Sequence, residues 1–170
     1  IDHLNSTRKL NIISLEDPIE FVHTSKQSQV IQRELGTHIP SSAEGVRAAM
    51  REDPDVILVG ELRDAETISM AMTAAETGHL VLGTLHTTGA VKTIDRIIDA
   101  FDIARQGEIR QQLAASLQCI LCQSLLPHRR AGGLIPATEV LVSNTAIRRA
   151  IRDGQGHLLD GMLETGQSAG

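Results

Sequence analysis

The strongest constraint on the fold is a four-residue apolar run, residues 56–59, that leads directly into Gly60 and Glu61. The run is too short for a helix and has the composition of a buried strand. In phosphate-transferring ATPases, an acidic residue that directly follows such a strand places its carboxylate beside Mg²⁺. The alternative is that Glu61 caps a helix beginning near Asp64, since acidic side chains favour helix N-termini. Taken alone, Glu61 fits both interpretations equally well.

The glycine-rich loop that cradles nucleotide phosphates, G-x-x-x-x-G-K-[ST], does not occur in the 170 residues. The chain has three lysines, Lys9, Lys26 and Lys92, and none of them follows a glycine. We therefore expect the chain by itself to bind Mg-ATP weakly and to lack detectable hydrolysis, because that loop supplies most of the phosphate contacts.

Composition narrows the class of partner. Hydrophobic residues make up 41% of the chain, which is enough for the core of one domain or part of one. Aromatic residues make up only 1% and the formal charge is −5, which argues against a nucleic-acid surface. No apolar run is as long as a membrane span, and two cysteines cannot build a disulfide framework. The cytoplasm is the expected compartment.

Strand-length apolar runs alternate with stretches of helical period, which predicts an α/β fold with a mostly parallel sheet. The expected strands are residues 11–15, 56–59, 79–85 and 135–142, with an antiparallel pair at 19–22 and 29–33. The strand at 79–85 is nearly all apolar, as a sheet covered on both faces requires. The expected helices run from a Ser41 cap to about Glu52, and over residues 64–77, 91–101, 108–125 and 145–153.

Local signals predict where several helices begin and end. Ser41 and Glu44 fit a capping box, and Asn144 is placed to cap the helix that follows it. Gly78 and Gly154 are placed to end helices.

A second acidic cluster, Glu16 and Asp17, also follows an apolar run, and Glu20 lies close behind it. Ligands of open α/β sheets bind outside the carboxyl ends of strands, so these carboxylates are expected beside Glu61. Two converging acidic clusters suit metal binding and water activation. For this cluster alone, an ordinary acidic turn is the more common explanation.

A third polar group, His86 and Thr87, follows the strand expected at 79–85. Imidazole and hydroxyl groups can bond a terminal phosphate, although a lone histidine at a strand end is more often structural. His79 begins the same strand and lies roughly 20 Å away along an extended chain, so it is not expected at the same phosphate.

The cysteines form a C-x-x-C pair, Cys119 and Cys122, within the helix expected at 108–125. Structural zinc needs four ligands and only His128 lies nearby, so we predict core packing and no zinc. The arginines at positions 129, 130, 148, 149 and 152 are most simply solvated surface, or face an acidic partner.

In series, these segments resemble the secretion and pilus motor ATPases of the type II/type IV secretion superfamily. Residues 15–21 (LEDPIEF) resemble the family's Asp box, residues 51–64 its Walker B motif and residues 77–88 its His box. The resemblance covers nearly the whole chain. It implies that residues 1–170 are a truncated C-terminal, RecA-like P-loop ATPase domain, whose full-length form has a phosphate loop and a PAS-like N-terminal domain.

The resemblance also implies roles for individual residues. Glu16 would activate water, Glu61 would serve Mg²⁺ and water, and Asp17 would lie near Mg²⁺. His86 and Thr87 would sense the γ-phosphate of ATP. Supporting positions of the motifs are Glu20, Gly60, Arg63, Asp64 and His79. Arg63 and Asp64 have the alternative of pairing with each other on the surface.

One further stretch favours the retraction branch of the pilus motors. Residues 146–153 (AIRRAIRD) are similar to that branch's A-I-R-N-L-I-R-E and depart from it at Arg149, Ala150 and Asp153. Arg148 and Arg152 would then contact a partner or transmit motion. The resemblance implies a homo-hexamer at the cytoplasmic side of the inner membrane, bound to a pilus platform protein. An extension or secretion branch of the superfamily, an accessory paralogue and a non-catalytic assembly module remain alternatives.

Overall fold

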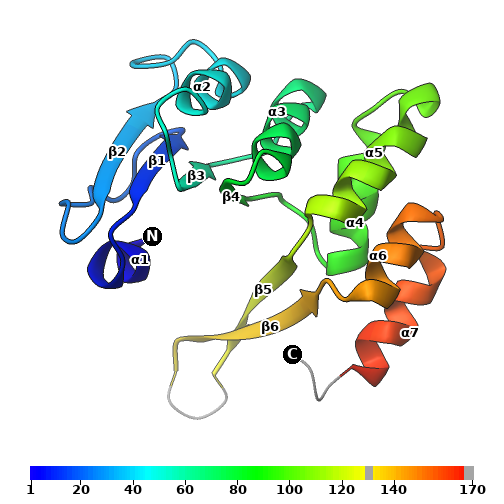
Figure 1. The fold of residues 1–170 in the computed structure, drawn as a ribbon. Helices are drawn as coiled ribbons and strands as arrows, with labels where there is room; N and C mark the ends of the chain where they lie inside the picture. The colour runs from blue at the N-terminus through cyan, green and yellow to red at the C-terminus, as the bar shows by residue number, and fades with distance from the viewer. Residues whose placement is uncertain (129–131, 167–170) are drawn as a thin grey trace. The chain divides into compact units, whose positions relative to one another are not determined.

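The computed structural model describes residues 1–128 and 132–166, and the chain divides into two compact units, Ile1–Leu85 and His86–Gly170 (Figure 1). The elements of the first unit are α1 (Asp2–Thr7), β1 (Asn11–Glu16), β2 (Gln29–Glu34), α2 (Ser42–Ala49), β3 (Val56–Val59), α3 (Ala65–Glu76) and β4 (Leu80–Gly83). Those of the second are α4 (Ala90–Asp99), α5 (Ile103–Ser116), β5 (Cys119–Pro127), β6 (Leu134–Val142), α6 (Thr145–Arg152) and α7 (His157–Thr165).

The first unit is built on a four-stranded parallel sheet in the order β2-β1-β3-β4. The central strand β1 is buried on both faces, with Ile12 and Ile13 fully covered, as its continuous apolar run requires. Val46 of α2 and Ala74 of α3 belong to the same core. The predicted α/β class, a mostly parallel sheet flanked by helices, is confirmed.

The antiparallel pair expected at 19–22 and 29–33 is wrong. Residues 19–22 form no strand, and β2 runs parallel to β1 with Ser14 opposite Gln32. Two parallel neighbours need a connection long enough to carry the chain back to the starting edge of the sheet. Residues 17–28 make that return, which the local sequence does not show.

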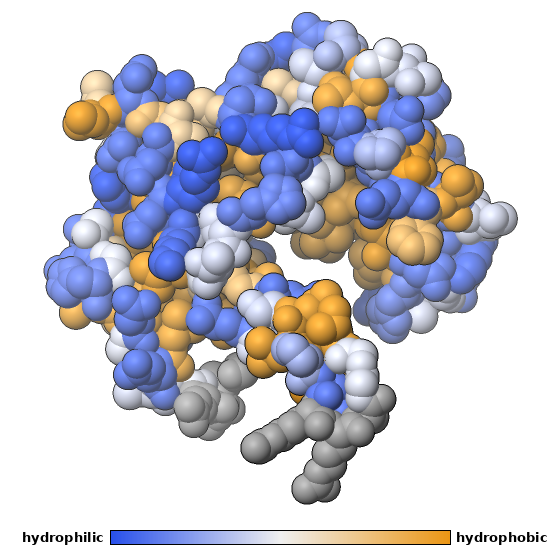
Figure 2. All heavy atoms as spheres, turned by 180° about the vertical axis from the view of Figure 1, so that it is seen from behind, coloured by the Kyte–Doolittle hydropathy of each residue, from blue (hydrophilic) through white to orange (hydrophobic). Residues whose placement is uncertain are grey.

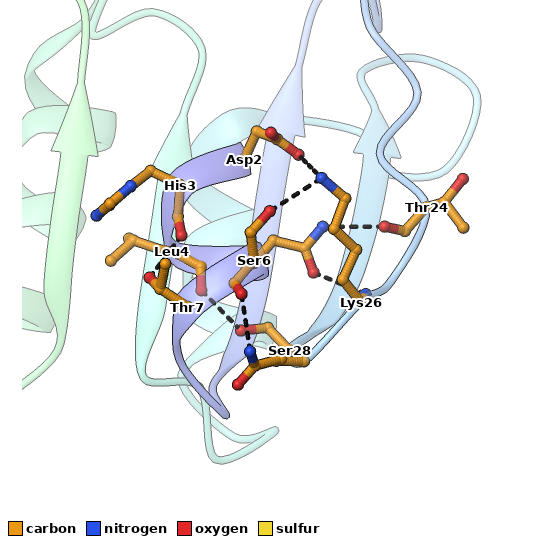
Figure 3. A network of polar contacts seen from close by, with 10 residues as sticks. Asp2, His3, Leu4, Ser6, Thr7, Thr24, Lys26 and Ser28 are labelled. Carbon is orange, nitrogen blue, oxygen red and sulfur yellow. Dashed lines mark hydrogen bonds and ion pairs between the residues drawn. The ribbon is translucent and has the colours of Figure 1, made fainter.

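The return connection is fixed by α1, a helix that the sequence did not predict. Asn5 of α1 is fully buried; its Nδ2 donates to Thr24 O at 2.9 Å and its Oδ1 accepts from Lys26 N at 2.9 Å. Ser28 is also buried, and its hydroxyl donates to Arg8 O at 2.7 Å. Figure 3 shows the network around α1, in which Lys26 reaches Asp2 and Ser6.

Most predicted helix ends of the first unit are confirmed. The Ser41 hydroxyl accepts from Glu44 N at 3.2 Å and caps α2, which ends at Ala49, earlier than the expected Glu52. Gly78 follows α3 with a φ of 103°, a left-handed conformation suited to glycine. The strand expected at 79–85 is shorter than predicted: β4 covers only Leu80–Gly83. It lies at the edge of the sheet, and Leu80 is 44% exposed rather than covered.

In the second unit the helix expected at 108–125 is wrong beyond Ser116. Leu117 takes an extended conformation, and the following apolar residues form β5, which pairs antiparallel with β6. The C-x-x-C pair therefore lies on a strand, where positions three apart face opposite sides, so the two thiols do not share an apolar face. Cys119 is exposed and Cys122 is half-buried.

The α6 prediction is confirmed: Asn144 Oδ1 accepts from Ile147 N at 3.0 Å, and Gly154 follows with a φ of 69°. The helix α7 was not predicted. Much of the β5–β6 hairpin is exposed, including Leu121, Leu125 and Leu134. On the face drawn in Figure 2, hydrophobic atoms lie among the polar ones at the surface.

Candidate functional site

The carboxyl ends of β1, β3 and β4 are tied together through the residues around Gly60. Gly60 N donates to Leu15 O at 2.7 Å, and the Thr84 hydroxyl donates to Gly60 O. Leu62 N donates to Thr84 O at 2.9 Å. These bonds bring the residues after β3 beside those after β1, which is where the sequence predicted the two acidic clusters to meet.

Gly60 is the position at which the backbones approach most closely. A Cβ atom added there would lie 3.0 Å from Leu15 O and 3.3 Å from the Cα of Glu16. Both are backbone atoms that cannot rotate away. A larger residue at this position would therefore push the backbone after β3 away from the end of β1.

Arg63 links the two acidic clusters. Its Nε donates to Glu61 Oε2 at 2.5 Å and its NH1 group to Asp17 Oδ2 at 3.0 Å. The hydrogen bond and charge of Glu61 raise the pKa of Arg63 further, with a smaller contribution from Asp17. Arg63 thus stays charged and draws the two carboxylates together.

The amino end of α3 decides between the alternatives for Glu61, as a helix cap or a site residue, and for Arg63, as a partner of Asp64 or not. Asp64 caps this helix: its Oδ1 accepts from Thr67 N at 2.8 Å and its Oδ2 from the Thr67 hydroxyl at 2.9 Å. The interpretation of Glu61 as the helix cap is therefore wrong, and so is the pairing of Arg63 with Asp64. Glu61 is left for another role.

Glu16 ends β1 and is half-buried. Its Oε1 accepts from the Ser14 hydroxyl at 2.7 Å and from Gln32 Nε2 at 2.9 Å. Glu20 is exposed in the connection after β1 and bonds to no other residue that the structure describes.

The two acidic clusters meet in an open pocket of about 170 Å³, and Glu20 is not among the residues that line it. Its polar lining consists of Glu16, Asp17, Ser41, Ser42, Glu61, Arg63 and Asp64. Within residues 1–128 and 132–166, no three His, Cys, Asp or Glu side chains are arranged to hold a metal ion by themselves. Carboxylate oxygens are nevertheless the donors that Mg²⁺ takes, usually one or two together with phosphate oxygens and water, so the donor set fits Mg²⁺ bound with a nucleotide.

The predicted phosphate-sensing residues belong to the second unit. His86 is exposed, and the Thr87 hydroxyl lies 2.6 Å from the Thr93 hydroxyl of α4. The nearby amino end of α4 is held by Glu139 of β6, whose Oε1 accepts from Ala90 N at 2.6 Å. The role of His86 and Thr87 stays a prediction.

His79 has a structural position. It precedes β4 and so lies at the amino ends of the parallel strands, whereas the carboxylates lie at their carboxyl ends. Its Nδ1 lies 2.9 Å from Ala74 O and 3.1 Å from the Thr77 hydroxyl. The imidazole thus joins the end of α3 to the start of β4.

Arg148 and Arg152 differ in what they contact. The Arg148 guanidinium donates to Ala115 O at 2.7 Å and Ala114 O at 3.3 Å, at the carboxyl end of α5. Arg152 is exposed, and among the described residues it forms an ion pair only with Asp153, at 3.2 Å. Arg129 and Arg130, the other predicted surface arginines, lie outside the described residues.

Sequence reasoning missed Ser14, Gln32 and Glu139. The spacing of Ser14 and Glu16 by two along a strand was an available signal, because such residues share a face. Gln32 acts across the β1–β2 pair, and Glu139 of β6 bonds the amino end of α4. The sequence revealed neither arrangement.

No helix in the described part of the chain combines the length and the apolar character needed to cross a bilayer.

Comparison with known proteins places these features in a family. The family described as "Type II/IV secretion system protein" matches residues 1–156. The chain is 49% identical to a "Twitching motility protein" of Neisseria gonorrhoeae and 48% identical to a "Type IV pilus retractation ATPase PilT" of Pseudomonas aeruginosa, in both cases over all 170 residues. It spans about half the length of these relatives, 46% and 49% respectively.

The same likeness holds in three dimensions. The crystal structure of the pilus retraction motor PilT with bound ADP superposes with a TM-score of 0.91 at 48% identity, covering 96% of this chain and 48% of that one.

Proposed function

Because this chain belongs to the type II/IV secretion system protein family, we propose that it is part of an ATP-hydrolysing motor that retracts a type IV pilus. The observation that carries the proposal is the meeting of Glu16, Asp17 and Glu61 in one pocket at the carboxyl ends of parallel strands. The names of the relatives support the retraction branch.

The carboxylates divide the work of hydrolysis. Glu16 is held by Ser14 and Gln32 and acts on the attacking water as general base. Glu61 and Asp17 would hold Mg²⁺ with its water ligands, and the cation would neutralise charge developing on the transferred phosphoryl group. Arg63 bonds both carboxylates and fixes their separation. His86 and Thr87, which follow β4 in sequence, would bond the γ-phosphate.

The proposed assembly is a homo-hexamer that works at the cytoplasmic side of the inner membrane and pulls through a pilus platform protein. A formal charge of −5 and the scarcity of aromatic residues disfavour nucleic acid as the track. In the basic helix α6, the exposed Arg152 is the better candidate for a partner contact, because Arg148 is engaged with α5.

The decisive experiment uses a chimera in which residues 1–170 replace the matching segment of the Pseudomonas aeruginosa relative. The chimera should hydrolyse ATP, and Glu61→Gln should lower kcat at least about 100-fold while ATP binding persists. Glu76→Gln removes an exposed carboxylate of α3 and serves as the matched control. A chimera that assembles yet hydrolyses nothing would leave only the non-catalytic assembly role. A Glu61→Gln variant with near-parent kcat would remove Glu61 from the mechanism.

A second experiment separates motility from hydrolysis in the same chimera. Arg152→Ala should keep ATP hydrolysis within a few-fold and abolish twitching motility when the gene replaces a native retraction motor. Arg96→Ala, an exposed arginine of α4, should change neither. Loss of both readouts in Arg152→Ala would place α6 in the catalytic ring. If motility were unchanged, α6 would no longer support the assignment to the retraction branch.

The 170-residue chain alone is expected to bind Mg-ATP poorly, because it lacks the glycine-rich loop and its lysine. Calorimetric titration is the test, and micromolar affinity for the isolated chain would contradict the expectation.

A further inference from the structure

Glu16 is held by two hydrogen-bond donors whose role the proposed reaction leaves open. The Ser14 hydroxyl and the Gln32 amide both donate to the same oxygen, Oε1, at 2.7 and 2.9 Å. No donor among the described residues bonds Oε2. One oxygen of the carboxylate is therefore anchored, and the other remains for a ligand in the pocket that Glu16 lines.

The two donors are positioned by the sheet itself. Ser14 and Glu16 are two residues apart on β1 and share a face, and Gln32 lies opposite Ser14 on the adjacent parallel strand β2. Ser14 is 1% exposed, so water does not compete for its hydroxyl. Sites built on strands hold side chains more precisely than sites on loops.

The orientation of the Gln32 amide is also determined. Its Nε2 donates to Phe21 O at 2.8 Å as well as to Glu16, and its Oε1 accepts from His23 N at 2.7 Å. A flipped amide would set its oxygen against a carboxylate and a carbonyl, and its NH₂ group against an N–H. Gln32 can therefore only donate to Glu16, and it joins that carboxylate to the 17–28 connection.

We propose that Ser14 and Gln32 are positioning residues that fix Glu16 for its action on water, an inference that rests on the proposed ATPase function. A general base must be within hydrogen-bond reach of the proton that it takes, and small displacements of such a group are costly. Neither residue contacts the nucleotide in this scheme; both act through Glu16.

The test uses the full-length chimera with Ser14→Ala and Gln32→Leu. Each should lower kcat roughly 10- to 100-fold and leave the KM for ATP within about twofold, because the phosphate contacts lie elsewhere. Ser14→Ala leaves the 17–28 connection untouched and covers the case in which Gln32→Leu fails to fold. Ser25→Ala removes a bond between that connection and Val30 of β2 without reaching Glu16, so its kcat should equal the parent's.

Two further measurements separate positioning from a general structural role. In a Glu16→Gln background, Ser14→Ala should cause no additional loss of kcat, since both changes act on one group. In a crystal structure of the Ser14→Ala chimera, the Glu16 carboxylate should leave its parent orientation while β1 and β2 stay in place.

Parent-like kcat in both variants would overturn the inference, as would an equal fall in Ser25→Ala or an additive loss in the Glu16→Gln background. An unmoved Glu16 carboxylate in the crystal structure would overturn it whether or not the protein hydrolyses ATP. Failure of the unmodified chimera to hydrolyse ATP would instead refute the proposed function, and the crystal structure would still decide whether these donors orient Glu16.

Discussion

The two units of this chain differ in the polar side chains that they bury and in the apolar side chains that they expose. Of the five buried polar residues found in the described part of the chain, Asn5, Ser14, Ser28 and Thr67 lie in the first unit and only Thr93 lies in the second. Of the eleven exposed large hydrophobic side chains among residues 1–128 and 132–166, eight lie in the second unit. The first unit uses buried hydrogen bonds to hold a connection and a candidate catalytic carboxylate, whereas the second leaves apolar surface uncovered.

The difference teaches where a substitution should cost most. A buried hydrogen bond that loses one partner leaves the other unsatisfied, which costs more than the bond itself contributes. The second unit has few such buried bonds, and its polar side chains mainly hold helix ends: Asn144 at α6, Glu139 at α4 and Arg148 at α5. Helix ends remain close to water, which can replace a lost partner. Removing one of these side chains should therefore cost less stability. Four predictions test this contrast.

The largest loss of stability is expected for Asn5→Ala. The side chain is fully buried, and its removal leaves Thr24 O and Lys26 N without their partner. The free energy of unfolding, from urea denaturation of the chain, should fall by about 2–3 kcal/mol. Asn144→Ala, which removes the same residue type from an exposed helix cap, should cost about 1 kcal/mol. Equal losses would erase the contrast between the units.

Arg148→Ala should have the next largest effect. It removes donors to Ala114 O and Ala115 O, and with them a positive charge at the carboxyl end of α5. We expect a loss of about 1–2 kcal/mol in the same unfolding measurement. Arg152→Ala removes only an exposed ion pair and should cost no more than about 0.5 kcal/mol. If Arg152→Ala proved the more harmful, Arg148 would not be a structural residue.

How far the sequence predicted each unit follows from the range of the interactions involved. In the first unit, β3 and α3 depend on neighbours a few residues away, so the apolar run at residues 56–59 and the helical period of residues 64–77 predicted them. The cap of α3 was not predicted, because the capping candidate was Glu61 and the cap is Asp64. The meeting of Glu16 with Glu61 was predictable as well, because parallel strands place their carboxyl ends at one edge of the sheet.

The errors arose where pairing between distant residues decides the structure. Residues 119–127 form an apolar run that fits a buried helix as well as a strand, and only pairing with β6 selects the strand. The parallel pairing of β2, and with it the contact of Gln32 with Glu16, depends on a return connection fixed by Asn5 of a helix with no clear sequence signal. The candidate acidic residues could be named in advance, but the side chains that orient them could not.

The reactivity of the two cysteines tests whether they face opposite sides of the strand β5, and the expected effect is smaller than those above. Burial raises the pKa of the Cys122 thiol above its ordinary value of 9.0, so near pH 8.5 it should carry less thiolate than in the unfolded chain. Iodoacetamide should therefore modify Cys122 in Cys119→Ser several-fold more slowly when the chain is folded than in urea. In Cys122→Ser, the exposed Cys119 should react at similar rates in both states. Equal protection of the two thiols would instead indicate that they share one buried face.

The smallest effect is expected from the exposed ion pair of Asp2 and Lys26, which lies beside the buried bonds of Asn5. The two kinds of contact can therefore be compared within one network. Lys26 Nζ lies 2.7 Å from Asp2 Oδ1, and this hydrogen bond, followed by the charge of Lys26, lowers the pKa of Asp2 from 3.8 (Figure 3). A carboxyl whose pKa is lower in the folded state stabilises the fold above its unfolded pKa and loses that effect as the pH falls through its folded pKa. Asp2→Asn should therefore lower the unfolding midpoint slightly at pH 6 and not at all near pH 2.

Salt separates the two kinds of contact in this network. Asp2 and Lys26 are exposed, so the small deficit of Asp2→Asn at pH 6 should also vanish in 1 M NaCl, where screening acts over about 3 Å. The deficit of Asn5→Ala comes from neutral, buried groups and should persist at both pH values and in salt. If the Asp2→Asn deficit matched that of Asn5→Ala, or ignored pH and salt, the connection would be held by its surface charges. Burial of Asn5 would then not explain why the first unit holds residues 17–28 in place.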